Sequence, residues 1–517
     1  MRTSWKTLLP LALAALAACD EERLCLSDQR LCGNVCITIA ADPANCGACG
    51  NACDVGQQCS GGLCRCADGR ADCDGACVDT RSDAAHCGGC GVACPGDTLC
   101  TTDAAGAASC RDACALPTQT ACGRACVALA EDAQNCGACG RACGTGERCE
   151  AGGCVADLYL ACYNSHEVRE ATRELAPAGV PIAVAPGPIS LAALGDSLYV
   201  ASAHWTGVET VSIIRRAPPA VRADPVWSLA APMQDLQALA VHDGLLYLSH
   251  ASVGTLLVLT PDGAVVDELP LLPAGAPTDA RNPNPHGIAF AGDDAYVTLN
   301  ERNEVVVLDV SRMAACARGE AASPCATEVA RIDVQPLASP GALARPSRLA
   351  AVGGRVYAAL WNLDAYWSPP AGSSGRLAAI DAATRALDAT VVTGGVAGLV
   401  DLDAGCLNPA GLALHEQTLW VTCGAFDYSR WPEVAISGGG VVPVDVSGAT
   451  PAPGAAIPAG PGEAPGNLAF CGGTGYVGDR NSGRVFRLDP LAGIVDGTEL
   501  CPASENYAYV ADLACGF

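Results

Sequence analysis

The chain has 517 residues, 33 Cys and a formal net charge of -25, with 55 Asp and Glu against 30 Lys and Arg. Such an acidic surface repels phosphate backbones, so the sequence argues against a nucleic-acid partner. Lys6 is the one lysine of the chain, and it lies in a segment that we expect to be removed. This excludes a Schiff-base lysine and a Walker-type phosphate lysine from the mature protein.

The amino-terminal segment predicts export to an oxidising compartment, and the cysteine content agrees with it. An apolar stretch, Leu8 to Ala18, follows a positively charged start and is too short to span a bilayer. It ends in Leu16-Ala17-Ala18-Cys19, which resembles the bacterial lipobox. The resemblance implies a signal peptide over 1–18, a lipid-anchored Cys19 and a linker over 19–24. The alternative is an ordinary signal peptide with an accidental Cys.

Three copies of one cysteine-rich module follow, over 25–64, 66–110 and 114–154. The inner six Cys of each copy share the spacing C-x3-C-x9-C-x2-C-x3-C-x5-C, which resembles the cysteine-rich repeat of the stigma-specific protein family. A module of this size with few large apolar side chains cannot bury a sufficient core, so disulfides are expected to stabilise it. Zinc is the alternative, because C-x2-C is also a ligand spacing. The short linkers between copies favour a semi-rigid stalk.

From Leu158 the sequence becomes β-rich, and a unit of roughly fifty residues recurs in it. Each unit pairs two alternating strands through a Gly- or Asp-bearing turn. The units begin at Pro188, Leu236, Pro285, Pro346, Pro409 and Pro465. The pattern resembles the NHL and YVTN-type seven-bladed propellers and, more loosely, the gluconolactonase-like ones. The resemblance implies an all-β fold, with a seven-bladed β-propeller over 157–517.

The two ends of this region are expected to complete one blade. Leu158–Cys162 and Glu167–Glu170 have the character of a second and a third strand, and Tyr507–Leu513 can supply the missing innermost strand. The eight Cys beyond the repeats are even in number, which favours pairing in an exported domain. The strand order predicts the bonds Cys316–Cys325, Cys406–Cys423, Cys162–Cys501 and Cys471–Cys515.

One face of the propeller is the candidate ligand-binding face. In such propellers the start of the innermost strand and the loop after the second strand open on the same side, and aromatic and polar residues gather there in this sequence. The candidate residues are His286, Trp361, Asp364, Tyr366, Trp367, Trp431 and Asn467. The alternative for Trp361 and Trp431 is packing between blades.

Two functions remain open. The first is an extracytoplasmic binding or adhesion module, anchored in the cell envelope by the lipid bilayer, with an unidentified protein or polysaccharide ligand and no cofactor. The second is a metal-dependent lactone or ester hydrolase of the gluconolactonase type, which needs a divalent metal. The triplets that match its Pro-Asn-Gly motif are Pro285-His286-Gly287 and Pro409-Ala410-Gly411, so the expected Asn is absent from both. No catalytic residue is predicted.

Overall fold

The computed structural model divides into two compact units, Met1–Leu129 and Ala130–Phe517, and the boundary falls inside the third cysteine-rich repeat. Cys19, the signal segment and Trp431 lie outside the described residues. The structure describes residues 30–516 except 33–34, 38, 41–44, 54–56, 61, 67–69, 74–75, 144–147, 151, 156, 196, 205–207, 216–221, 230–234, 274–281, 403–404, 431–438, 461–462, 472 and 504–507. No helix in these residues is long and apolar enough to cross a membrane.

The cysteine-rich repeats consist of short strands, most of them in two-stranded hairpins. Their strands are β1 (Arg30–Cys32), β2 (Val35–Ile37), β3 (Gln57–Ser60), β4 (Leu63–Cys66), β5 (Ala71–Cys73), β6 (Ala76–Val78), β7 (Leu99–Thr102), β8 (Ala108–Arg111), β9 (Thr120–Cys122), β10 (Ala125–Val127), β11 (Arg148–Glu150) and β12 (Gly153–Val155). The hairpins β1–β2, β5–β6 and β9–β10 recur at equivalent places in the three repeats.

Disulfides follow one pairing order in these repeats. In the second repeat the first Cys bonds to the third, the second to the fifth, the fourth to the seventh and the sixth to the eighth. The described bonds of all three repeats are Cys32–Cys49, Cys46–Cys59, Cys53–Cys64, Cys66–Cys77, Cys73–Cys90, Cys87–Cys100, Cys94–Cys110, Cys114–Cys126, Cys136–Cys149 and Cys143–Cys154. Sulfur bonded to sulfur leaves no thiolate for zinc, so these bonds favour the disulfide interpretation.

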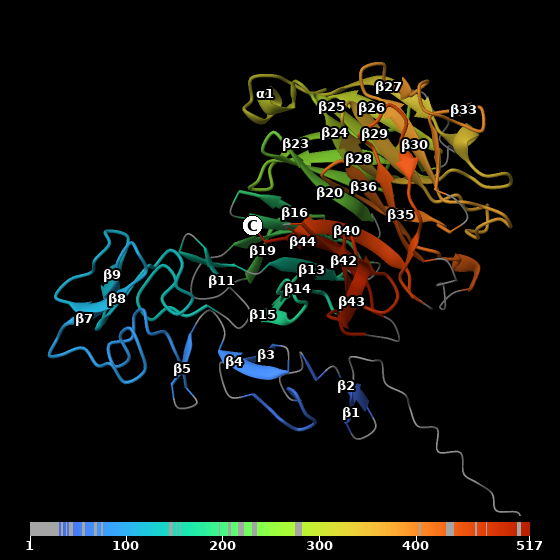
Figure 1. Ribbon diagram of the computed structural model, residues 1–517. Helices are drawn as coiled ribbons and strands as arrows, with labels where there is room; N and C mark the ends of the chain where they lie inside the picture. Colours follow the sequence, from blue (N-terminus) through green and yellow to red (C-terminus); the bar gives the residue numbers. More distant parts are fainter. Residues whose placement is uncertain are drawn as a thin grey trace, which may run out of the picture. The chain divides into compact units, whose positions relative to one another are not determined.

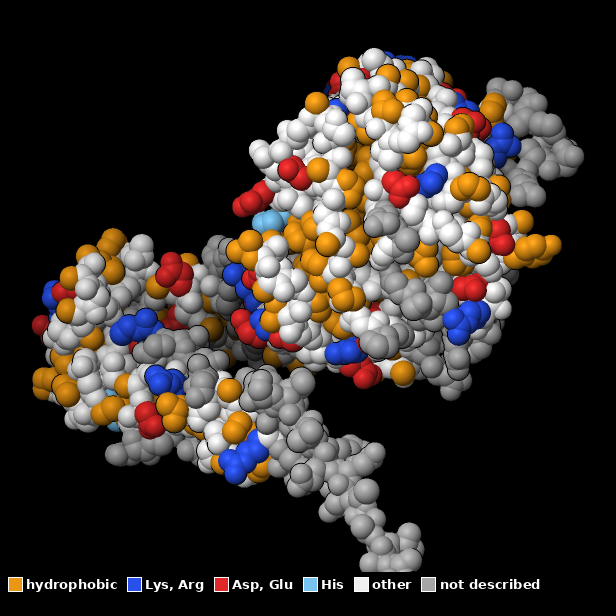
Figure 2. All heavy atoms as spheres, turned by 45° about the vertical axis from the view of Figure 1, so that its right-hand side comes forward, with side chains coloured by type: hydrophobic (Ala, Val, Ile, Leu, Met, Phe, Trp, Pro, Cys, Tyr) orange, Lys and Arg blue, Asp and Glu red, His pale blue; other side chains and the backbone are white. Residues whose placement is uncertain are grey.

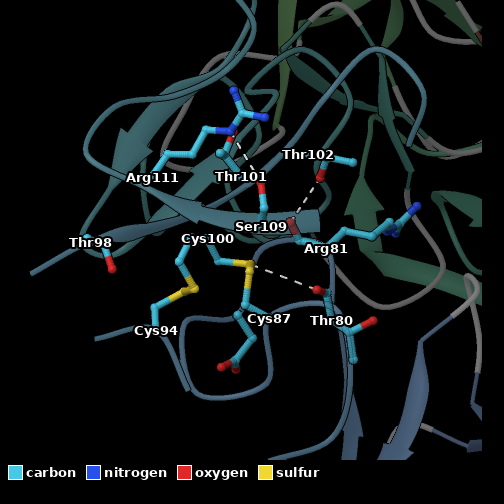
Figure 3. The surroundings of a disulfide bond; sticks show 12 residues. Thr80, Arg81, Cys87, Cys94, Thr98, Cys100, Thr101, Thr102, Ser109 and Arg111 are labelled. Atoms are coloured by element: carbon cyan, nitrogen blue, oxygen red, sulfur yellow. Dashed lines mark hydrogen bonds between the residues drawn. A yellow bond between two sulfur atoms is a disulfide. The ribbon is translucent and has the colours of Figure 1, made fainter. Parts of the chain in front are cut away.

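The second repeat shows how little else holds such a module. Its buried apolar cluster consists of Cys87, Cys94 and Cys100. Figure 3 shows the Cys87–Cys100 bond beside the segment at Thr80 and Arg81, where the hydroxyl of Thr102 donates to the carbonyl of Arg81 at 2.9 Å. The sulfur atoms themselves therefore form the core of the repeat.

The region from Leu158 to Cys515 is a β-propeller, as the sequence predicted, and its described residues form seven sheets of four or five strands (Figure 1). From the innermost strand outward, the sheets are β44 (Val510–Cys515), β13 (Leu158–Cys162), β14 (Glu167–Ala171) and β15 (Pro177–Ala183); β16 (Pro188–Leu194), β17 (Ser197–Ser202), β18 (Glu209–Arg215) and β19 (Arg222–Leu229); β20 (Leu236–His242), β21 (Leu245–His250), β22 (Thr255–Leu259) and β23 (Val265–Pro270); β24 (Pro285–Ala291), β25 (Asp294–Leu299), β26 (Glu304–Asp309) and β27 (Thr327–Asp333); β28 (Pro346–Val352), β29 (Arg355–Leu360), β30 (Arg376–Asp381), β31 (Ala386–Leu387) and β34 (Leu399–Asp401); β35 (Pro409–His415), β36 (Thr418–Cys423), β37 (Gly440–Asp445), β38 (Ala452–Pro453) and β39 (Ile457–Pro458); and β40 (Pro465–Cys471), β41 (Thr474–Asp479), β42 (Arg484–Asp489) and β43 (Gly493–Glu499).

Loops between these strands carry the remaining short elements. They are α1 (Met313–Ala317), the 3-10 turns η1 (Gln335–Leu337) and η2 (Tyr428–Arg430), and the hairpin β32 (Val392–Thr393) with β33 (Val396–Ala397). Figure 2 shows one side of the molecule, where charged side chains are scattered between apolar ones. None of these elements interrupts the order of the sheets.

The ring closes because the two ends of the region share one sheet. β44 pairs antiparallel with β13, and each innermost strand contacts the next around the ring, including β40 with β44 and β44 with β16. The carboxy-terminal strand runs over Val510–Cys515 rather than Tyr507–Leu513, because its pairing with β13 continues to Cys515. The shared sheet is therefore the one that the sequence predicted, with its innermost strand placed later in the chain.

Aromatic side chains at one position of the second strand fill the space between sheets. These residues are Tyr199, Tyr247, Tyr296, Tyr357, Trp420 and Tyr476, and all are buried. Three tyrosines also donate to a carbonyl in the outer part of the next sheet: Tyr199 to Pro261 at 3.1 Å, Tyr296 to Ala382 at 3.4 Å and Tyr476 to Arg173 at 2.9 Å. The recurring aromatic of the sequence unit is thus a packing residue, and in these three sheets its hydroxyl is also satisfied across the boundary between sheets.

Near the axis, hydroxyl groups join several sheets to their neighbours. Thr298 accepts a bond from the backbone N–H of Gly287 at 2.7 Å and donates to the carbonyl of Ser347 at 2.6 Å. A Cβ on Gly287 would lie 2.2 Å from that same carbonyl oxygen, so only glycine fits there. This close approach holds the starts of the innermost strands in fixed positions around the central cavity.

Four disulfides reinforce the propeller, and their pairings are those expected from the sequence. The bonds are Cys162–Cys501, Cys316–Cys325, Cys406–Cys423 and Cys471–Cys515, with Cα–Cα distances of 5.2, 6.1, 5.1 and 5.4 Å. Cys162 and Cys501 are 339 residues apart in the chain, so their bond joins the two ends of the ring.

Candidate functional site

Seven equivalent hydrogen bonds define one face of the propeller. In each, the residue after a second strand donates its backbone N–H to the residue at or near the start of the neighbouring innermost strand. The donor and acceptor pairs are Tyr163 and Tyr509, Ala203 and Gly187, Ala251 and Asp235, Asn300 and Asn284, Trp361 and Arg345, Gly424 and Asn408, and Arg480 and Ala464. Strand starts and second-strand loops therefore open on the same side, as expected from the sequence.

A cavity of about 520 Å³ opens on this face at the centre of the ring. Its volume lies within the range of small-molecule sites in proteins, roughly 300–1,000 Å³. Its lining residues come from every sheet and are Tyr163, Ile189, Asp235, Gln237, Asn284, His286, Ser347, Arg348, Trp361, Trp367, Ala410, Phe426, Ala464, Gly466, Asn467, Arg480, Asn481, Tyr509 and Ala511. Aromatic and polar side chains of this lining lie on different sides of the cavity.

Aromatic rings form an arc on one side of the cavity. Trp361 packs edge-on against Phe426 with ring centroids 5.5 Å apart, and its centroid lies 6.1 Å from that of Trp367. The centroids of Tyr163 and Tyr509 are 5.5 Å apart. We call these five side chains the aromatic arc.

Arginines are placed among the rings of the aromatic arc. The guanidinium carbon of Arg480 lies 5.5 Å from the Phe426 ring and 5.3 Å from the Tyr509 ring. The guanidinium carbon of Arg345 lies 3.8 Å from the Trp367 ring, and Arg345 also pairs with Glu301 at 2.7 Å. Cation–π contacts thus join both arginines to the aromatic arc, and the Arg480 guanidinium adds positive charge to this side of the cavity.

Polar side chains line the other side, on the β20 and β24 sheets: Asp235, Gln237 and Asn284. Burial raises the pKa of Asp235 and the charge of Glu209 adds to this, while Gln237 and His250 act in the opposite direction. Glu209 and His250 are almost fully buried beside it, with Nε2 of His250 3.1 Å from a Glu209 carboxylate oxygen. Asp235 is therefore a carboxyl group at the cavity whose pKa is raised by burial and by the nearby charge of Glu209.

His286 lies between the polar side and the aromatic arc. Its ring centroid is 5.1 Å from that of Trp361, in an edge-on arrangement. Burial, together with the charges of Arg348, Arg480 and Arg345, lowers the pKa of His286 to about 3. The imidazole is thus neutral at physiological pH, when it can act as one donor and one acceptor.

Four of the seven predicted face residues line the cavity: His286, Trp361, Trp367 and Asn467. Asp364 instead closes its own loop, because one carboxylate oxygen accepts from the backbone N–H groups of Tyr366 and Ser368 at 2.7 and 3.0 Å. Tyr366 is 81% exposed and lies outside the cavity lining. Trp431 falls outside the described residues.

Trp361 combines the two roles that the sequence left open. It is only 6% exposed and packs with Leu363 and Phe426, so it is a packing residue that also forms part of the cavity wall. Three residues of the cavity lining were not predicted from the sequence: Tyr163, Asp235 and Tyr509. Their signal was position alone, because each stands at or next to a strand start or a second-strand end.

A divalent metal does not fit this lining. Oxygen-rich sites for such ions use several carboxylates and carbonyls, whereas Asp235 is the only carboxylate among the described residues of the cavity wall. Two arginines in the same lining, Arg348 and Arg480, would repel a cation.

Comparisons with known proteins show no family for this chain. No protein-family model matches the chain, and no curated protein matches it in sequence. Among solved structures, a protein of Lactobacillus plantarum is 14% identical with a TM-score of 0.48, covering 70% of this chain and 99% of its own. A provisionally assigned 6-phosphogluconolactonase of Bacteroides uniformis is 14% identical with a TM-score of 0.46, at the same coverages. Virginiamycin B lyase of Staphylococcus aureus is 13% identical with a TM-score of 0.42, covering 64% of this chain and 94% of its own.

Proposed function

We propose that this protein is a cell-envelope lipoprotein, anchored through Cys19, whose propeller binds a small polar ligand in its central cavity. The observation that carries the proposal is the lining of that cavity. Aromatic rings on one side and amide, imidazole and carboxyl groups on the other are suited to a ring-shaped ligand with polar substituents. A carbohydrate unit from a polysaccharide has this chemistry, so the ligand comes from the extracytoplasmic polymers rather than from nucleic acid.

The lining side chains project from rigidly held backbone, which also supports binding. The side chains come from strand starts that the inter-sheet bonds hold in place, such as Thr298 to Ser347. Asp235, Asn284, Arg345 and Asn408 at these starts have positive φ angles between 47° and 56°. Non-glycine residues rarely adopt this conformation, which clusters at functional sites because the surrounding structure must hold it.

The hydrolase alternative has less support, because its metal does not fit the donors of the cavity. Binding and metal hydrolysis can be separated with the purified full chain. We expect its melting temperature to rise with one class of polar ligand, with one-to-one stoichiometry by calorimetry, and to keep that response after EDTA treatment. A ligand at a hundred times its Kd adds about 2.7 kcal/mol of stability. Stoichiometric bound metal, with ligand turnover that EDTA abolishes, would contradict the proposal in favour of the hydrolase.

The anchor has its own test. Cys19→Ala should release the protein from membranes and abolish labelling by a palmitate analogue, because the acyl chains are attached to this residue and its new amine. Labelling retained in the variant would refute the lipid anchor and leave the binding proposal standing.

A further inference from the structure

One arginine of the cavity has no partner of its own. Arg348, near the start of β28, lines both the main cavity and a second cavity of about 160 Å³ further along the axis. Within the part of the chain that the structure describes, no hydrogen bond or ion pair engages its guanidinium group. Arg345 and Arg376 differ, because they pair with Glu301 at 2.7 Å and with Asp401 at 3.6 Å.

The nearest carboxylate does not fill this role. Asp512 lines the second cavity, and its oxygens accept from the hydroxyl of Ser190 at 3.0 Å, the backbone N–H of Leu191 at 2.9 Å and the amide of Asn467 at 3.1 Å. Burial raises the pKa of Asp512, and the charge of Arg348 acts against this. Arg348 therefore affects the pKa of Asp512 through space, without a hydrogen bond or ion pair to it, and its side chain lines both cavities.

The position of Arg348 fits an anion attached to a ring. Trp361 and Trp367 follow the second strand of the same sheet, so the aromatic arc begins beside Arg348. The same lining also contains Gln237 and Asn284, whose amides bind the hydroxyl groups of such a ring.

We infer that the ligand of the central cavity is a carboxylated sugar, such as a uronic acid residue, with its carboxylate on Arg348 and its ring against the aromatic arc. This rests on the proposed binding function and names its ligand class. The guanidinium fork matches a carboxylate in a bidentate manner. A phosphate dianion suits the cavity less, because Asp235 in the same lining and Asp512 nearby add negative charge.

The test is titration calorimetry on the full chain with three probes: tri-galacturonate, its neutral counterpart galactotriose, and glucose 6-phosphate. We expect tri-galacturonate to bind about tenfold or more tightly than either other probe, and Arg348→Gln to remove that advantage. Arg348→Lys keeps the charge without the fork and should lose part of it. Arg215→Gln removes the same charge from an exposed strand end and should change nothing.

Each outcome decides a different statement. Equal binding of tri-galacturonate and galactotriose, or full affinity in Arg348→Gln, overturns the inference and leaves the proposed function intact. Tighter binding of glucose 6-phosphate overturns it in favour of a phosphate ligand. If none of the three probes gives binding heat, the inference is overturned. The proposed binding function would still be supported if a neutral or cationic ligand raised the melting temperature.

If Arg348→Gln fails to fold, a second measurement on the unmodified chain tests the inference. Affinity for tri-galacturonate should fall as salt rises, whereas affinity for galactotriose should not, because salt screens an ion pair. Affinity for tri-galacturonate that does not depend on salt overturns the inference.

Discussion

The two parts of the chain are stabilised in different ways. The second cysteine-rich repeat buries little beyond its own sulfur atoms, whereas the propeller buries aromatic and aliphatic side chains between every pair of neighbouring sheets. The repeats thus depend on covalent bonds, and the propeller depends on packing that disulfides reinforce. Because the stability of the propeller comes from the interfaces between its sheets, the cavity at its centre can remain open for a ligand.

The largest expected effect is loss of a repeat. Cys87→Ala with Cys100→Ala should unfold residues 66–110, because a native disulfide in so small a domain contributes about 2–5 kcal/mol and these sulfurs are its core. Limited proteolysis with peptide mapping would detect the cleavage. Cys316→Ala with Cys325→Ala, which removes a loop disulfide of the propeller, is the control and should leave a folded domain. A second repeat that resists proteases without its bond would show that packing holds it.

Next in size is the bond that joins the ends of the ring. Cys162→Ala with Cys501→Ala should lower the free energy of unfolding of the propeller by up to roughly 5 kcal/mol, because the bond restricts a very long loop in the unfolded chain. Denaturant unfolding followed by tryptophan fluorescence measures it. The variant should still fold, since β13 and β44 remain paired. A variant that is unfolded in buffer would mean that the disulfide, rather than packing, closes the ring.

A smaller effect is expected from acid. The pKa of His286 is lowered to about 3 in the folded chain, whereas a histidine in the unfolded chain has a pKa of about 6.5. Between these two pH values the unfolded chain binds a proton at this residue and the folded chain does not. This residue therefore destabilises the propeller increasingly as the pH falls from about 6.5 toward 3. His286→Gln should lose less stability than the unmodified chain between pH 7 and pH 4, as measured by chemical unfolding at each pH. Identical pH dependence in the two proteins would place the histidine in water.

The smallest effect belongs to the exposed aromatic of the long loop. Tyr366→Ala should change stability by less than about 0.5 kcal/mol, because its side chain is 81% exposed. Trp361→Ala, five residues earlier, should cost about 3–5 kcal/mol through the cavity it leaves. Thermal unfolding of the two variants compares them directly. A large loss in Tyr366→Ala would reveal a contact for this side chain that the loop does not show.

The sequence was most informative where one residue determines a local geometry. The proline and aromatic of each unit located the strands, and the order of strands was enough to pair Cys162 with Cys501. It was least informative where side chains choose between neighbours. Asp364 and Tyr366 belong to the same loop as Trp367, yet the Asp364 turn places Tyr366 in solvent while Arg345 stacks on Trp367. Such choices depend on residues far apart in the chain, and no local pattern encodes them.

The claim that the propeller binds the ligand while the repeats carry it can be tested most directly by hydrogen exchange. Mass spectrometry of the full chain, with and without tri-galacturonate, reports protection for each segment. We predict slower exchange at the strand starts that line the cavity, above all around Arg348 and Asn467, and no change in residues 66–110. Protection confined to the cysteine-rich repeats, with none in the propeller, would contradict the account.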